Sequence, residues 1–303
     1  MIKVLLLFSG GLDSILAAKI LKEQKIEIIP ICFKSFFFDC ETAKKYAKKL
    51  RFKLKIEDIS KEQLKIVKFP TCGRGKGINP CIDCHLLMLK TAGKIIKKGK
   101  VDFLATGDVL GERPFSQNRE SFNKIDEKAN LKGLVLRPLS AKLLPKTIPE
   151  KRGMIKREKL YAISGKSRKP QIKLAKKFKI KDFPSPAGGC ILTNLEYSRK
   201  LKELFKKNSK ADGRDCQALR KGRAVWEEKK LFLIGRNEKE NRELKELRKK
   251  KDKILEPDNF SGPTVLIKGF GKKIKKENIK RGTELLFNYS KKLPDNIKIK
   301  IND

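Results

Sequence analysis

The sequence predicts an α/β protein in two parts, a parallel sheet with helices on both faces followed by a smaller basic α+β domain. Residues 1–110 alternate apolar, β-prone runs with segments of helical spacing, and this order is typical of a parallel sheet covered on both faces. A break rich in Pro and Gly over residues 183–190 cannot hold a helix or a central strand. We therefore expect one domain at residues 1–190 and a second at residues 191–303.

The first part predicts strands and helices in alternation. Apolar or alternating residues predict strands at residues 2–8, 26–33, 53–59, 101–105 and 134–139. Helical spacing of apolar residues predicts helices at residues 15–21, 40–50, 80–98, 149–163 and 169–178. Because ligands bind at the carboxyl ends of parallel strands, we expect three segments that follow strands to meet at one edge: residues 9–14, 32–38 and 106–108.

The second part gives weaker patterns and is dense in basic residues. It predicts basic or charged helices at residues 197–207 and 239–250, a strand pair within residues 223–234 and a strand at residues 264–268. Residues 284–292 predict a last helix or strand, and residues 297–301 predict a β-like tail.

The chain of 303 residues carries a net charge of +40, which favours a polyanionic partner such as nucleic acid. Lysine outnumbers arginine and is spread along the chain, so a compositional bias is the alternative. The longest apolar runs are far shorter than the roughly 20 residues of a bilayer span, and Met1 leads directly into a strand pattern and not into a signal peptide. We therefore expect a cytoplasmic protein with no membrane partner, whose seven cysteines are reduced.

The segment Ser9–Ser14 reads S-G-G-L-D-S and follows the first predicted strand. The first backbone N–H groups of a helix lack internal partners and attract an anion, and the two glycines allow the backbone to approach a phosphate closely. The two serines add hydroxyl donors. Asp13 would repel a phosphate unless a cation lies between them, so it is either a Mg²⁺-side residue or a helix cap. The alternative for the whole segment is a capped helix after a glycine turn.

This segment also resembles the pyrophosphate loop of the PP-loop ATP pyrophosphatases, which have the adenine nucleotide alpha hydrolase-like fold. The resemblance implies that the chain binds ATP with Mg²⁺, splits it between the α- and β-phosphates and adenylates a carbonyl of its substrate. It also implies that the adenine lies against the strand ends at residues 31–33 and 106–107. The nucleotide-binding residues expected from it are Phe8, Ser9, Gly10, Gly11, Asp13, Ser14, Phe33, Thr106 and Gly107, with Asp13 also catalytic.

A second chemical centre is the segment N-P-C-I-D-C-H at Asn79–His85. A C-x-x-C pair places two thiols within reach of one metal or of each other, but one pair is too few for a tetrahedral site. The best third thiol is Cys190, which follows two glycines. Three thiolates would leave one iron of a [4Fe–4S] cluster open to a non-protein ligand. The alternatives are a redox or persulfide pair of Cys84 with Cys190, a zinc site that adds Cys72 or His85, and incidental thiols.

The other cysteines and the single histidine carry less information. Cys32, Cys40 and Cys216 have no partner spacing, and we expect them to be small buried residues. His85 is expected on a helix surface or behind the metal ligands and not as a general base.

Three motifs in order resemble the tRNA 2-thiouridine synthetase group of the PP-loop class: N-P-C-x-x-C at residues 79–84, A-T-G-D at residues 105–108 and P-A-G-G-C at residues 186–190. In that group one cysteine handles sulfur and a later cysteine is its partner, which implies catalytic roles for Cys84 and Cys190. This chain departs in having Asp108 where the group has histidine, and Cys81 as an extra thiol. The trio is therefore more similar to the cluster-bearing tRNA thiolases, which implies a [4Fe–4S] cluster held by Cys81, Cys84 and Cys190.

The second part is similar, more weakly, to the RNA-binding module of the NFACT proteins. The matching stretches are residues 234–241 and 261–264. The tripeptide Gly235-Arg236-Asn237 offers an arginine at a turn, which suits contact with a phosphate. The alternative is a plain basic α+β cap on the first domain.

Together these patterns predict an ATP-dependent tRNA sulfurtransferase that forms AMP and pyrophosphate. It would adenylate a uridine carbonyl and replace the oxygen with sulfur handled at the three-cysteine centre. The expected partners are tRNA and a sulfur donor, either a protein persulfide or inorganic sulfide. The alternatives are a PP-loop enzyme that adenylates, or trades sulfur with, a small molecule, and a non-catalytic RNA-binding protein.

Overall fold

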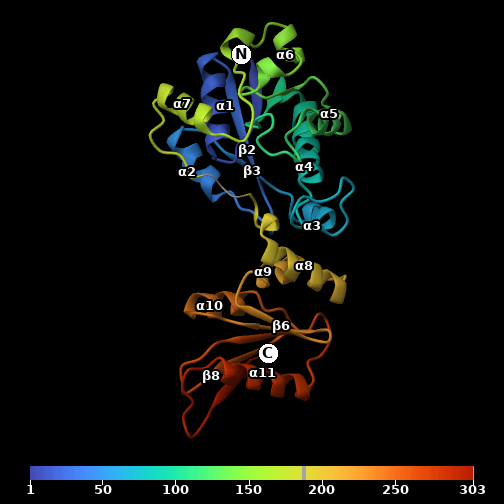
Figure 1. The fold of residues 1–303 in the computed structure, drawn as a ribbon, viewed down its shortest axis with the longest axis vertical. Helices are drawn as coiled ribbons and strands as arrows, with labels where there is room; N and C mark the ends of the chain where they lie inside the picture. The colour runs from blue at the N-terminus through green and yellow to red at the C-terminus, as the bar shows by residue number, and fades with distance from the viewer. Residues whose placement is uncertain (186–188, 303) are drawn as a thin grey trace. The chain divides into compact units, whose positions relative to one another are not determined.

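The chain forms two compact units in the computed structural model, Met1–Thr193 and Asn194–Asp303. The structure describes residues 1–185 and 189–302, so part of the Pro- and Gly-rich break expected at residues 183–190 lies outside the described residues. Figure 1 shows a sheet with helices on both faces in the first unit and a separate sheet in the second. Among the described residues, no helix is long and apolar enough to cross a membrane.

The first unit is built on a five-stranded sheet in the order β3-β2-β1-β4-β5. Every neighbouring pair in it is parallel, so the predicted fold class is confirmed. Its strands are β1 Lys3–Leu7, β2 Glu27–Lys34, β3 Lys55–Asp58, β4 Phe103–Ala105 and β5 Val135–Leu136.

Helices cover both faces of this sheet because the central strand is apolar on both sides. In β1, Val4 and Leu6 pack into one core cluster and Leu5 packs into the other. The first cluster contains residues of α1 (Leu12–Glu23), α2 (Glu41–Lys49) and α7 (Lys169–Lys177). The second contains residues of α4 (Cys81–Ile95) and α5 (Arg119–Lys128), and α3 (Ser60–Lys68) packs against α4. A π-helical turn, Ile96–Lys100, continues α4.

The predicted helix at residues 149–163 is wrong. The structure has only the four-residue helix α6 (Ile148–Lys151) and a 3₁₀ turn at Arg157–Lys159. Gly153 has a φ of +70°, a left-handed conformation that ends a helix. The helices α3 and α5 were not predicted, although Asn118, whose side chain accepts from Ser121 N at 2.7 Å, is a standard start signal for α5.

The second unit contains an antiparallel sheet in the order β10-β8-β9-β7-β6. The predicted strand pair at residues 223–234 is confirmed, whereas β8 was not predicted and the last helix begins earlier than residue 284. The strands are β6 Arg223–Glu227, β7 Lys230–Ile234, β8 Lys253–Pro257, β9 Val265–Lys268 and β10 Ile299–Asn302. The helices are α8 Leu195–Lys207, α9 Gly213–Ala218, α10 Glu238–Glu246 and α11 Lys276–Asn288.

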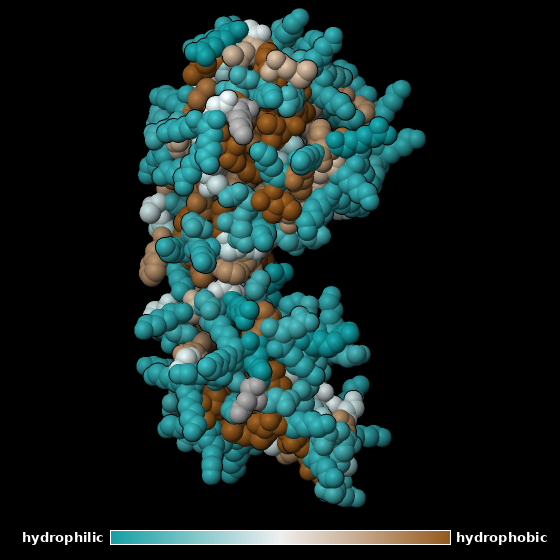
Figure 2. Space-filling view, turned by 180° about the vertical axis from the view of Figure 1, so that it is seen from behind, coloured by the Kyte–Doolittle hydropathy of each residue, from teal (hydrophilic) through white to brown (hydrophobic). Residues whose placement is uncertain are grey.

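Hydrophilic side chains dominate the face of the molecule that Figure 2 shows, as the composition leads one to expect.

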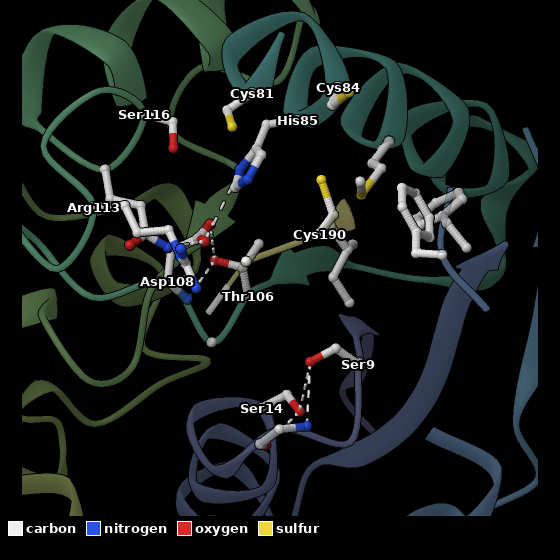
Figure 3. Close-up of a pocket in the computed structure, with 18 of the residues that line it drawn as sticks. Ser9, Ser14, Cys81, Cys84, His85, Thr106, Asp108, Arg113, Ser116 and Cys190 are labelled. Atoms are coloured by element: carbon white, nitrogen blue, oxygen red, sulfur yellow. Dashed lines mark hydrogen bonds and ion pairs between the residues drawn. The ribbon is translucent and has the colours of Figure 1, made fainter. Parts of the chain in front are cut away.

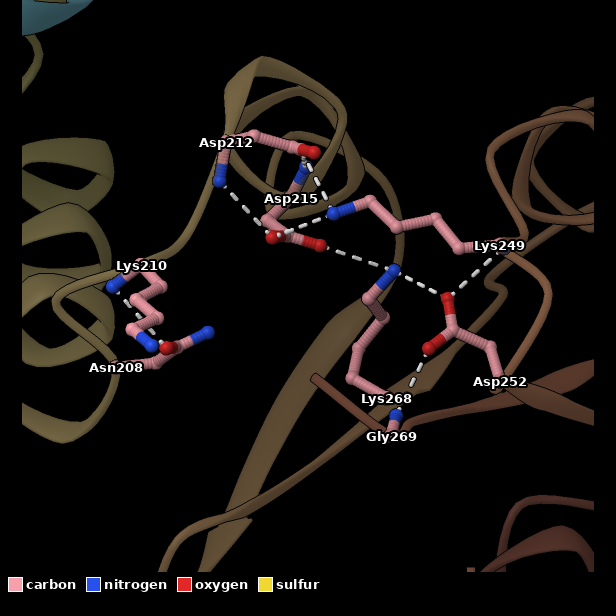
Figure 4. A network of polar contacts seen from close by, with 8 residues as sticks. All are labelled: Asn208, Lys210, Asp212, Asp215, Lys249, Asp252, Lys268 and Gly269. Atoms are coloured by element: carbon pink, nitrogen blue, oxygen red, sulfur yellow. Dashed lines mark hydrogen bonds and ion pairs between the residues drawn. The ribbon is translucent and has the colours of Figure 1, made fainter. Parts of the chain in front are cut away.

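The second unit also contains buried charged side chains. The side chain of Lys268 is fully buried on β9 and forms ion pairs with Asp215 (3.0 Å) and Asp252 (Figure 4). Lys249 pairs with Asp215 at 2.7 Å and with Asp212 at 2.8 Å. These contacts tie α9 to β9 and to the start of β8.

We expect Lys268→Met to lower the free energy of unfolding of the second unit by about 3–5 kcal/mol, because it leaves the buried Asp252 without its cation and Asp215 with Lys249 alone. Chemical denaturation followed by fluorescence measures this unit, since Trp226 is the only tryptophan of the chain. The matched control is Lys300→Met, whose pair with Asp258 is at the surface and is worth at most about 1 kcal/mol. Equal losses in the two variants would contradict a stabilising role of the buried network.

Candidate functional site

A cavity of about 490 Å³ lies in the first unit where β1, β2 and β4 end, a volume within the range of about 300–1,000 Å³ typical of small-molecule sites. Figure 3 shows Ser9 and Ser14 on one side of this pocket and three cysteines on another. The sequence-predicted site residues that line it are Phe8, Ser9, Gly11, Asp13, Ser14, Phe33, Cys81, Cys84, Thr106, Gly107 and Cys190. Gly10 is the one predicted site residue that is not part of the lining.

The segment after β1 forms a tight turn into α1, whose N-cap is Gly11. Gly10 has a φ of +76°, and a Cβ there would lie 2.6 Å from the carbonyl oxygen of Thr42, so only glycine fits. The Ser14 hydroxyl donates to the Gly11 carbonyl at 2.8 Å, and Gly11 N donates to Ser9 Oγ at 3.3 Å. These contacts hold both serines at the N-terminus of α1, where an anion is favoured.

Gly107 lies directly against this helix start. A Cβ on Gly107 would come within 2.6 Å of Ser14 N and 2.8 Å of the Asp13 carbonyl carbon. The chain that leaves β4 therefore passes so close to the first amides of α1 that there is no room for a side chain at Gly107. This close approach brings the two segments that were predicted to bind a nucleotide into one wall of the pocket.

Asp13 lies in the first turn of α1, and no side chain caps this helix. Its Oδ1 is buried and accepts no hydrogen bond from the described residues. Burial raises the pKa of this carboxyl above its ordinary value, and the nearby charge of Arg168 opposes the rise. An orphaned, buried carboxylate oxygen in a pocket fits the chemistry of Mg²⁺, which binds through one or two carboxylates together with phosphates.

The two cysteines of the C-x-x-C pair each receive a hydrogen bond from a side-chain amide. Gln63 Nε2 donates to Cys84 Sγ at 3.3 Å, and Asn79 Nδ2 donates to Cys81 Sγ at 3.0 Å. Gln63 belongs to α3 and is fully buried. Sequence reasoning missed Gln63, because no motif marks a contact between residues so far apart in the chain.

Cys190 reaches the same pocket from the end of the first unit. A backbone hydrogen bond from Ile78 N to the Leu192 carbonyl (3.1 Å) joins its segment to the segment that precedes α4. Burial raises the pKa of Cys190, to which the neighbouring Cys81 adds, and burial raises the pKa of Cys84 to about 12. Without a cation, these thiols are therefore protonated at neutral pH.

The three thiols fit an iron–sulfur cluster in donor type and in sharing one pocket wall. However, across residues 1–185 and 189–302, no group of three or more His, Cys, Asp and Glu side chains is arranged to hold a metal ion. Cys81, Cys84 and Cys190 would be the ligands of a cluster that assembles here.

A polar corner of the pocket was only partly predicted. Asp108 accepts hydrogen bonds from Thr106 Oγ1 and Gln117 Nε2, both at 2.9 Å, and its Oδ1 lies 4.0 Å from His85 Nδ1 (Figure 3). Although burial alone would raise the pKa of Asp108, His85, Arg137 and these donors lower it below the ordinary value. His85 therefore faces an ionised carboxylate inside the pocket and does not lie on an outer helix surface. The lining residues that sequence reasoning missed here are Glu112, Arg113, Ser116 and Gln117.

The remaining cysteines are placed as follows. Cys32, Cys40 and Cys216 are buried, as expected. Cys32 also lines the pocket, and it shares a core cluster with Cys40, a neighbour that their spacing did not indicate. Cys72 is not part of the pocket lining, and its backbone N–H donates to Asp83 at 2.9 Å.

Two family models match the chain, one in each part. Residues 2–143 match the family described as Thiamine biosynthesis protein (ThiI), and residues 222–303 match the NFACT protein RNA binding domain. The expected PP-loop likeness of the first part and NFACT likeness of the second are thus confirmed. None of the curated proteins matches the chain.

Three solved structures are similar to the chain at 20% identity. A predicted subunit of tRNA methyltransferase from Methanocaldococcus jannaschii matches over 58% of this chain and 76% of its own, with a TM-score of 0.39. A 4-thiouridine synthetase, in complex with RNA and ATP, matches over 59% and 51%, with a TM-score of 0.38, so the chain spans about half its length. The U34-tRNA thiolase NcsA from Methanococcus maripaludis, with its [4Fe–4S] cluster, matches over 68% and 66%, with a TM-score of 0.33.

We expect Gly107→Ala to weaken ATP binding by roughly 5- to 100-fold, because the added methyl group must displace the start of α1 and overpacking of this kind costs about 1–3 kcal/mol. Isothermal titration calorimetry with Mg–ATP measures the change. Gly93→Ala is the matched control, since a Cβ there would meet Leu131 at an ordinary 3.5 Å. Unchanged ATP affinity in Gly107→Ala would contradict a nucleotide site at this wall.

Proposed function

We propose that the chain is an ATP-dependent tRNA uridine thiolase, which adenylates a uridine carbonyl and replaces its oxygen with sulfur. The observation that carries this proposal is the pocket itself. One cavity is lined both by the turn into α1, suited to a triphosphate, and by the thiols of Cys81, Cys84 and Cys190, suited to sulfur chemistry. The family matches support it, since they pair a ThiI-type part with an RNA-binding part.

In this proposal the first unit activates a poor leaving group. The N-terminus of α1 and the hydroxyls of Ser9 and Ser14 hold the phosphates of ATP, and Asp13 would hold the Mg²⁺ that accompanies them. The uridine carbonyl oxygen attacks the α-phosphorus, and pyrophosphate leaves. The proton on the ring nitrogen beside that carbonyl goes to His85, which lies 4.0 Å from Asp108 in the same pocket. This proposal gives His85 the general-base role that was not expected of it from the sequence. The carbonyl oxygen is now part of an AMP leaving group.

The sulfur step uses the thiol wall of the same pocket. With inorganic sulfide as donor, hydrosulfide attacks the activated carbon, the carbon–oxygen bond breaks, and AMP leaves with the oxygen and its electron pair. With a persulfide on Cys84 as donor, its terminal sulfur attacks instead. Cys190 then displaces that sulfur, and the resulting disulfide with Cys84 is reduced by an external thiol. A bound [4Fe–4S] cluster would supply an open iron for a sulfide ligand.

We expect Cys84→Ser and Cys190→Ser each to reduce thiouridine formation by roughly a thousandfold or more, while tRNA-dependent release of pyrophosphate continues. The loop and the thiols act in successive steps, so loss of sulfur handling leaves the activation intact. Mass spectrometry of tRNA nucleosides and a pyrophosphate assay measure the two steps. Cys216→Ala, in the second unit, is the control and retains both.

The same assay distinguishes the alternatives. Pyrophosphate release that ignores added tRNA would indicate a small-molecule acceptor. An absence of pyrophosphate release would indicate an RNA-binding protein without this catalysis. Full thiouridine formation by Cys84→Ser would remove the sulfur role that we assign to this residue.

We expect the chain purified without oxygen to contain iron and inorganic sulfide in equal amounts, and the triple variant of Cys81, Cys84 and Cys190 to Ser to contain neither, because these three residues are the cluster ligands that we propose. Elemental and sulfide analysis of the purified protein measures this. Stoichiometric zinc in place of iron would contradict a cluster at this site.

A further inference from the structure

The edge strand β6 of the second unit carries an unusual set of aromatic and cationic side chains. Trp226 stacks on Phe270, with ring centroids 6.1 Å apart and planes inclined by 13°. Lys207, which also pairs with Glu203, lies over the Trp226 ring at 4.7 Å. Toward the other end of β6, the guanidinium of Arg223 lies 5.0 Å from the ring of Tyr289, a side chain that is 41% exposed.

These side chains flank a free backbone edge. In the described sheet β6 pairs only with β7, so one side of its backbone has no strand partner. Side chains alternate along a strand, and on β6 this places Arg223 and Trp226 on opposite faces. Trp226 Nε1 is buried and has no hydrogen-bond partner among the described residues.

Lysines gather where β6 turns into β7. Lys230 is the cross-strand neighbour of Glu227, and Lys272 and Lys275 follow Phe270 in the segment between β9 and α11. Partial burial lowers the pKa of Lys230, the charges of Lys272 and Lys275 lower it further, and the charge of Glu277 opposes this.

Nearby acidic groups cancel only part of this charge. Glu227 is paired with Arg281, and Glu277 with Lys275 at 3.4 Å. Lys272 is exposed and has no ion pair among the described residues. Lys251, whose Nζ donates to the Gly271 carbonyl at 2.8 Å, holds the segment that presents Phe270 and Lys272.

We propose that Lys207, Arg223, Trp226, Lys230, Phe270, Lys272, Lys275 and Tyr289 form an RNA-binding platform, which takes an unpaired RNA segment by base stacking and phosphate contacts. The platform rests on the proposed function, in that tRNA supplies the RNA. Aromatic side chains beside a positively charged track are typical of proteins that bind single strands. Unpaired bases are needed because bases inside a duplex present no free face for stacking. Recognition of this kind tolerates many sequences, so the platform supplies affinity and not the choice of uridine.

The test uses the full chain with two probes, an unmodified tRNA transcript and a single-stranded oligouridine. The only tryptophan of the chain lies in the platform, so RNA binding is expected to change its fluorescence. Anisotropy of labelled RNA gives the affinity without relying on tryptophan fluorescence. Measured at several salt concentrations, it also gives the number of phosphate contacts.

Two kinds of variant separate charge from stacking. The double variant Lys230→Gln/Lys272→Gln tests charge. We expect the plot of log affinity against log salt to become less steep by about 1.4, because each lost contact between a lysine and a single-strand phosphate reduces the steepness by about 0.7. For Phe270→Ala, we expect affinity to fall by roughly fivefold or more with the slope unchanged. The matched control is Lys298→Gln with Lys300→Gln, which removes the same charge at or beside β10, on the opposite edge of the sheet, and should leave the slope nearly unchanged.

Several outcomes would overturn the platform. One is an unchanged Trp226 fluorescence while anisotropy reports RNA binding. A second is a change of slope in the Lys298/Lys300 control as large as that in the Lys230/Lys272 variant. A third is that duplex RNA or polyglutamate competes as well as oligouridine does. None of these readouts uses thiouridine formation. A chain that binds RNA as described but makes no thiouridine would retain the platform and lose the proposed function, and the reverse result would do the opposite.

Discussion

The close approach of two backbones at Gly107 and Ser14 is the constraint on which the first unit depends. All five strands run parallel, so their carboxyl ends face the same edge, and helix starts follow at that edge. The absence of a side chain on Gly107 lets the segment after β4 lie against the first amides of α1. The residues that we assign to the phosphates of ATP and to Mg²⁺, which are Ser9, Asp13 and Ser14, lie at this contact or at the turn at Gly10 beside it.

The same edge brings together the two walls that the proposed reactions need. The turn into α1 is rich in N–H and O–H donors, which stabilise negative charge. On the thiol wall, burial raises the pKa values of Cys84 and Cys190, and the amides of Gln63 and Asn79 donate hydrogen bonds to the sulfur atoms of Cys84 and Cys81. A neutral, desolvated thiol does not compete with the triphosphate for the N–H and O–H donors of the turn into α1. The two walls therefore differ in charge, while they share the space in which an activated carbonyl would meet sulfur.

Sequence patterns predicted the parts of this arrangement that depend on local chemistry. The parallel strands, the turn at Ser9–Ser14 and the placement of Thr106 and Gly107 follow from apolar runs and glycines. The partners of Asp108 and Cys84 could not be predicted, because Gln117 and Gln63 reach them only through packing of separate segments. The prediction of a helix at residues 149–163 was wrong for a local reason. Its apolar spacing continues past Gly153, but the backbone conformation of Gly153 ends the helix.

The central claim is that the oxygen of a uridine carbonyl becomes part of AMP before sulfur takes its place. Transfer RNA labelled with ¹⁸O at its uridine carbonyls tests this most directly, when it is incubated with the full chain, Mg–ATP and a sulfur donor. The account predicts that the AMP released is heavier by the mass of one label, and that its amount equals that of the thiouridine formed. Unlabelled AMP accompanying thiouridine would contradict activation of the carbonyl by adenylation.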